Sequence, residues 1–126
     1  MTLTLDAPTA RRLLAGARVG VGALAVLAPK LTGKLVGVDP EANPAAVYMT
    51  RMFGARELFM ASPFLLPAPG LDEAELAQRG IPVDAIDLAA ALLAGLSGAL
   101  PVRAALPAAG AAAGGVALGV IASRDA

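Results

Sequence analysis

The chain has 126 residues, of which 57% are hydrophobic and 16% charged, and its formal net charge is zero. Soluble domains carry about 25% charged residues, so this composition favours a membrane protein, and the length predicts one domain over residues 1–126. Lys and Arg residues do not cluster, which argues against a nucleic-acid partner. Because the chain has neither Cys nor His, we expect no disulfide, no metal site and no cofactor.

The first predicted helix covers residues 10–28, with Thr9 as its N-cap and Pro29 closing it. Its apolar run also resembles the core of a signal peptide, but Arg18 inside the run and Pro29 at the would-be cleavage point fit that alternative badly. Residues 30–44 hold both lysines and two prolines. They are therefore predicted to form a loop.

The second predicted helix covers residues 45–61 and contains three charges, Arg51, Arg56 and Glu57, in an otherwise apolar segment. Pro63 is expected to end or kink it. At helical spacing, one stripe has Arg56 near its middle. Its other members are Met49, Met52, Phe53 and Met60. With Arg18, this stripe is a candidate surface for binding a hydrophobic ligand, and ordinary packing is the alternative.

A short polar helix is predicted at residues 71–80, outside the membrane, because acids come first and Arg79 and Gly80 come last. The third and fourth long helices are predicted at 83–100 and 103–123. Spanning the hydrocarbon takes about 20 residues, so the four long segments predict an all-α bundle of four transmembrane helices. A soluble Ala-rich bundle is the alternative, but it requires a polar face, and the last two segments show none beyond Asp84 and Asp87.

Charged residues inside these segments predict a buried network. One charge at the centre of a membrane helix costs about 2.5–3.5 kcal/mol when it faces lipid alone. We therefore predict that Arg18 and Arg56 pair with Glu57, Asp84 and Asp87 inside the bundle. For Asp84, a role as the N-cap of the third helix is an equally simple alternative.

Pairs of small residues four apart predict close helix packing. They are Gly16 with Gly20, Ala91 with Gly95, Gly110 with Gly114, and Gly115 with Gly119. These Gly-rich faces also predict a homo-oligomer.

Three stretches resemble a bacterial family of small integral membrane proteins with four predicted helices, which share a domain of unknown function. They are Ala17-Arg18-Val19-Gly20 followed by Pro29, Arg51-Met52-Phe53-Gly54-Ala55-Arg56-Glu57-Leu58, and Val83-Asp84-Ala85-Ile86-Asp87. The resemblance implies a four-helix membrane fold and implies no activity. The polar connector at residues 70–80 departs from the family pattern.

Ionisable residues within membrane segments are functional candidates. The first hypothesis is a structural or accessory protein, or one that binds a hydrophobic small molecule, in the inner membrane of a bacterium with the lipid bilayer as its partner. The alternative is a membrane-embedded isomerase, cyclase or epoxide hydrolase, in which Asp84, Asp87 and Glu57 are the catalytic acids and bases. A proton-coupled transporter built from several copies is a third hypothesis.

Overall fold

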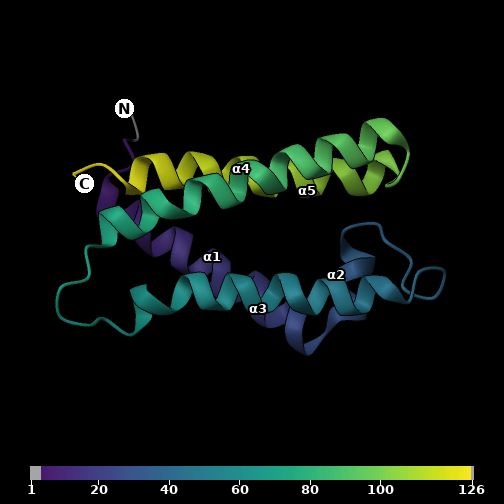
Figure 1. Cartoon of the computed structure of the whole chain (residues 1–126), viewed down its shortest axis with the longest axis horizontal. Helices are drawn as coiled ribbons and strands as arrows, with labels where there is room; N and C mark the ends of the chain where they lie inside the picture. The colour runs from purple at the N-terminus through teal and green to yellow at the C-terminus, as the bar shows by residue number, and fades with distance from the viewer. Residues whose placement is uncertain (1–3, 126) are drawn as a thin grey trace.

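The computed structural model describes residues 4–125, and all the regular structure within them is helical. Five helices follow in order, α1 (Ala7–Leu27), α2 (Pro29–Leu35), α3 (Ala45–Leu65), α4 (Glu73–Ser97) and α5 (Val102–Ala122). The helix α1 packs along α3, and α4 packs along α5, so two long helix pairs make up the molecule (Figure 1). The prediction of an all-α fold is confirmed.

Two of the helices, α4 and α5, are long and apolar enough to cross a membrane. A third candidate arises if α1 and α2, which meet at a bend of 117°, count as one broken span. Among the described residues 4–125, α3 is not one of the candidate membrane spans. This helix carries the charged residues Arg51, Arg56 and Glu57. The structure therefore shows two or three candidate spans where the sequence predicts four.

The first helix begins earlier than predicted, because Asp6 and not Thr9 is its N-cap. The Oδ1 atom of Asp6 accepts a hydrogen bond from the backbone N–H of Thr9 at 2.8 Å, and Pro8 lies in the first turn. A second difference is α2, which begins at Pro29 and occupies the first part of the predicted loop. Proline suits the first turn of a helix, where its missing N–H would have no partner anyway.

The predicted connector helix and the predicted third helix are one continuous helix, α4. Asp72 caps it by accepting from the backbone N–H of Ala74 at 2.9 Å, and Gly98 ends it with a φ of 80°. Gly80 was predicted as a stop, but it is buried in mid-helix, where Arg18 and Met60 lie against it. Pro82 is accommodated within the helix, so the prediction of a separate short helix is wrong.

Glycines set the closest helix contact of the first pair. A Cβ on Gly54 would lie 2.7 Å from the carbonyl oxygen of Gly22, and one on Gly22 would lie 2.9 Å from the carbonyl oxygen of Gly54. Of the predicted small-residue pairs, Gly95 and Gly119 do face a neighbouring helix. At four other glycines of these pairs, an added Cβ would meet no described atom within 4 Å; they are Gly16, Gly20, Gly110 and Gly114. Their role in a homo-oligomer stays a prediction.

The buried apolar residues are small and the large ones are exposed. Alanines and Leu14 make up the buried hydrophobic set among the described residues. Leu27, Phe59 and Leu96 are 81%, 79% and 87% exposed. Small residues let helix backbones approach closely, as they do in membrane bundles, and the large exposed side chains form a surface that water does not favour.

Candidate functional site

Arg18 of α1 lies at the centre of a group of charged side chains from three helices. It donates from Nη1 to Oε2 of Glu57 at 2.8 Å, and from Nη2 to Oδ2 of Asp84 at 2.6 Å. Arg18, Glu57 and Asp84 are 5%, 6% and 5% exposed. One buried guanidinium thus connects α3 to α4, two helices that otherwise touch little. The predicted pairing of Arg18 is confirmed, and Asp84 is not an N-cap.

Arg56 of α3 forms a second, more open part of the network. Its Nη2 donates to Oδ2 of Asp87 and lies 3.7 Å from Oε1 of Glu57. The side chains of Arg56 and Asp87 are 39% and 27% exposed, so water reaches this pair more easily than it reaches Arg18. The guanidinium carbon of Arg56 lies 5.2 Å from the ring centroid of Phe53, which adds a cation–π contact.

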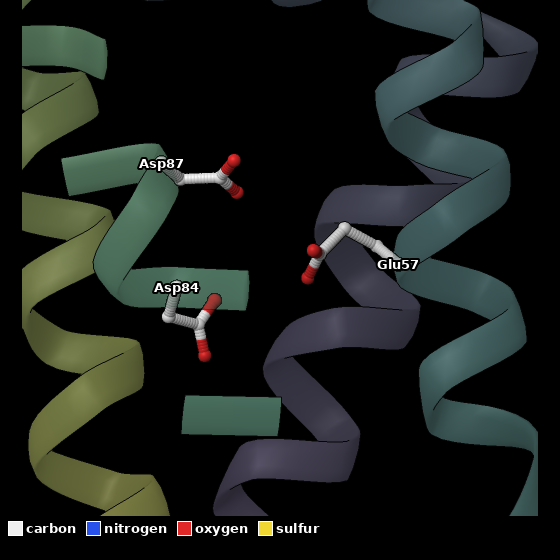
Figure 2. Close-up of side chains that lie close together, drawn as sticks. All are labelled: Glu57, Asp84 and Asp87. Atoms are coloured by element: carbon white, nitrogen blue, oxygen red, sulfur yellow. The ribbon is translucent and has the colours of Figure 1, made fainter. Parts of the chain in front are cut away.

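Three carboxylates converge between α3 and α4. Figure 2 shows Glu57 reaching from α3 toward Asp84 and Asp87 of α4, and oxygen atoms of the three lie within 4.8 Å of one another. Carboxylates at this spacing repel each other unless positive charge lies between them. Arg18 and Arg56 supply that charge, but the group still holds one negative charge in excess when all five side chains are ionised.

Two buried atoms of the network lack a hydrogen-bond partner among the residues described. They are Oε1 of Glu57 and Nε of Arg56. Buried polar groups in proteins are almost always paired with protein or with water. An acceptor and a donor are therefore available beside the carboxylates for a water molecule, an ion or a polar group of a ligand.

Glycines on two helices make room for the network. A Cβ on Gly115 of α5 would lie 2.7 Å from Cγ of Asp84, and one on Gly80 of α4 would lie 3.2 Å from Nη2 of Arg18. From the sequence alone, Gly115 is expected to serve helix packing and Gly80 to stop a helix. Their role beside the charged groups becomes visible only when the partner across the helix interface is known.

An apolar cavity of about 200 Å³ lies beside Arg18, between α1, α3 and α4. Its wall includes Leu14, Phe59, Met60, Phe64, Leu76 and Val83. Arg79 also lines it, but the side chain of Arg79 is 73% exposed and pairs with Glu75. Among the described residues that line the cavity, Arg18 is therefore the buried polar group.

The predicted ligand-binding residues do not all meet at this cavity. Met60 and Arg18 line it, whereas Met49, Met52 and Phe53 are 60%, 49% and 37% exposed. The residues that the sequence analysis missed lie one or two turns from those it named: Leu14 precedes Arg18 by four positions, and Leu76 and Gly80 precede Asp84 by eight and four. Helical spacing places Leu14 on the same face as Arg18, but the expected helix break after Gly80 separates Leu76 and Gly80 from Asp84.

Comparisons of the chain with models of protein families, with curated proteins and with solved structures find no match. The resemblance to small four-helix membrane proteins therefore stays a prediction.

Proposed function

We propose that the protein binds an apolar small molecule that carries one hydrogen-bond-accepting oxygen. The cavity beside Arg18 carries this proposal, because ligand sites are mostly apolar with a few polar groups that fix the orientation. Arg18 is held in place by Glu57 and Asp84, so its guanidinium is positioned before any ligand arrives. Such preorganisation lowers the entropy cost of binding.

A membrane location follows from the same features, and we propose the inner membrane of a bacterium. The apolar helices α4 and α5 and the exposed large side chains support it. We further propose that α3 is a span, and that α1 with α2 completes a bundle of four. The charges of α3 would be tolerated because Glu57 and Arg56 pair with α1 and α4, and pairing removes most of the cost of a charge in lipid.

The size and charge of the site restrict the ligand. A cavity of about 200 Å³ is slightly larger than the roughly 150 Å³ that admits benzene in an engineered protein, so it has room for a substituted six-membered ring beside Arg18. An anion would compete with the two carboxylates that Arg18 already binds. A neutral carbonyl, ether or epoxide oxygen fits better, because it accepts a hydrogen bond without adding charge.

Acetophenone and α-methylstyrene test this proposal, since they differ in one oxygen in place of a methylene group. Titrated into protein in lipid nanodiscs and followed by calorimetry, acetophenone is expected to bind at least about tenfold more tightly, because a hydrogen bond to a charged group contributes about 1.5–3 kcal/mol. Val83→Phe, which fills the cavity, should abolish binding of both. The matched control is Leu106→Phe, at a position 65% exposed on α5, and it should bind like the unaltered protein.

Equal affinity for the two ligands would contradict the role of Arg18. If neither ligand binds, the proposed ligand-binding function is excluded, and a structural or accessory role remains.

Acid–base catalysis on an apolar substrate is a second candidate, favoured by Oε1 of Glu57, which has no hydrogen-bond partner among the described residues. This oxygen could take a proton, and Arg18 could stabilise developing negative charge on the substrate. The cavity wall, as far as the described residues form it, contains no carboxylate, so ligand binding is the better-supported proposal. Styrene oxide provides the test: diol formation that Glu57→Gln abolishes would establish the enzyme, and no diol above the heat-denatured protein would exclude this hydrolysis.

A further inference from the structure

The free oxygen of Glu57 needs a partner that the described residues do not supply. Glu57 is 6% exposed, and its Oε1 atom is buried without a hydrogen bond from any of them. Arg56 lies 3.7 Å from it, but that guanidinium donates to Asp87. Leaving a buried charged acceptor unpaired costs more free energy than leaving a neutral one unpaired, so an additional partner is expected at this oxygen.

The charge of the group indicates what kind of partner fits. With Glu57, Asp84 and Asp87 against Arg18 and Arg56, one negative charge is in excess when all are ionised. No further charge comes from the adjacent helix α5, which meets Asp84 through Gly115 and carries Arg103 as its one charged residue, near its first turn. One added positive charge would make the buried group neutral, which is the state that an apolar environment favours.

The ligand atoms indicate a hard cation. All three acids offer oxygen, the ligand that Na⁺, Ca²⁺ and Mg²⁺ prefer, so the lack of His and Cys does not count against this class. A cation with bonds of about 2.3–2.6 Å holds opposite oxygens roughly 4.6–5.2 Å apart, whereas Mg²⁺ needs about 2.0–2.1 Å. The carboxylate oxygens here lie within 4.8 Å of one another, so one cation of the larger kind can contact all three side chains.

We propose that one Na⁺ ion binds between Glu57, Asp84 and Asp87, with Oε1 of Glu57 as its first ligand. Na⁺ has nearly the radius of Ca²⁺ but supplies the single charge that the group lacks. Both oxygens of Asp84 accept from Arg18, at 3.4 Å and 2.6 Å, so Asp84 contributes its charge and one remaining lone pair on each oxygen. The three carboxylates are not among the residues that line the apolar cavity, so this site is separate from the proposed ligand site.

The test measures the thermal unfolding midpoint of the full chain in detergent while NaCl is replaced by N-methyl-D-glucamine chloride at constant ionic strength. A cation that binds the folded state raises the midpoint by mass action. We expect a saturable rise of about 3 °C or more in Na⁺. Binding of ²²Na⁺ by the same preparation should approach one ion per chain.

Glu57→Gln should lose the response to Na⁺, even if its midpoint in the organic cation is lower. If that variant does not fold, Asp87→Asn replaces it, because Asp87 is 27% exposed and its loss disturbs the core less. Glu75→Gln, a carboxylate on the surface of α4 that pairs with Arg79, is the matched control and should keep the response.

Equal midpoints in the two salts would overturn the proposal in favour of an ordered water or a proton at Glu57. A rise with CaCl₂ or MgCl₂ but not with NaCl would overturn the assignment of a monovalent ion.

Discussion

Gly115 of α5 occupies a position where any side chain would collide with the network. An added Cβ would lie 2.7 Å from Cγ and 2.8 Å from Oδ2 of Asp84. Asp84 cannot move away without lengthening its hydrogen bonds to Arg18. The geometry of the buried charges therefore depends on the absence of a side chain on a helix that contributes none of them.

Gly115→Ala is expected to lower the free energy of unfolding by about 1–3 kcal/mol, the usual cost of overpacking. Gly114→Ala is the matched control, since a Cβ on this preceding residue would meet open space among the described atoms. Alanine there should stabilise the protein by up to about 1 kcal/mol through helix propensity. Thermal or denaturant unfolding in detergent measures both. If the two variants behaved alike, the close approach of Asp84 to α5 would be refuted.

The helix α1 begins at a side-chain cap formed by Asp6. Hydrogen bonds from the side chain and the backbone N–H of Thr9, with the charge of Arg12 nearby, hold the pKa of Asp6 below its ordinary value. Because the folded-state pKa is the lower one, the ionised cap stabilises α1 above the unfolded-state value of about 3.9. That contribution is lost as the pH falls through the folded-state pKa.

Asp6→Ala should therefore increase amide hydrogen exchange at Thr9 roughly two- to tenfold at neutral pH, because the first turn loses its cap. The difference from the unaltered protein should vanish below the folded-state pKa of Asp6. Asp6→Asn caps without titrating and is the control, with protection that does not change over this pH range. An effect of Asp6→Ala that persisted in acid would show that the carboxylate is not the source of the stability.

The helices could largely be located from sequence, but their ends could not. Apolar periodicity finds α1, α3 and α5 within a few residues, since it reports a buried face directly. The predicted start of α4 was wrong because Gly80 and Pro82 are residue types that usually interrupt helices. In the structure, Gly80 packs against Arg18 and the helix continues through both positions. Tertiary contacts decide such cases, and a single sequence does not display them.

The charge network was predictable in its members and not in its arrangement. The cost of isolated charges in apolar helices predicts that Arg18 and Arg56 meet Glu57, Asp84 and Asp87. Sequence spacing does not tell which arginine is central, whereas the structure gives Arg18 two buried carboxylates and leaves Arg56 partly exposed. The cavity was not predicted, because it forms from residues of three helices.

The whole molecule consists of two helix pairs with a charged junction between them, formed by the ion pairs of Arg18 with Glu57 and Asp84. The helices α1 and α3 pack on each other, as do α4 and α5, while α1 also touches α5 (Figure 1). That last contact includes Arg11, whose Nε donates to the carbonyl of Ala122 at 2.8 Å. Small alanines fill the interior and large apolar groups lie outside. A buried apolar cluster joins the two pairs, since Ala10 and Leu14 of α1 pack with Ala77 of α4 and Ala122 of α5. The buried ion pairs of Arg18 add a specific contact between α3 and α4.

A double-mutant cycle on Arg18 and Asp84 tests this junction most directly, with unfolding free energies measured in detergent for Arg18→Met, Asp84→Asn and the double variant. Each single change should cost about 3–5 kcal/mol, because it leaves a buried charge uncompensated. The double variant should cost at least about 2 kcal/mol less than the sum. The same cycle on the exposed pair of Arg79 and Glu75 should give a coupling below about 1 kcal/mol. Additive effects at Arg18 and Asp84 would contradict the claim that this ion pair joins the two halves of the molecule.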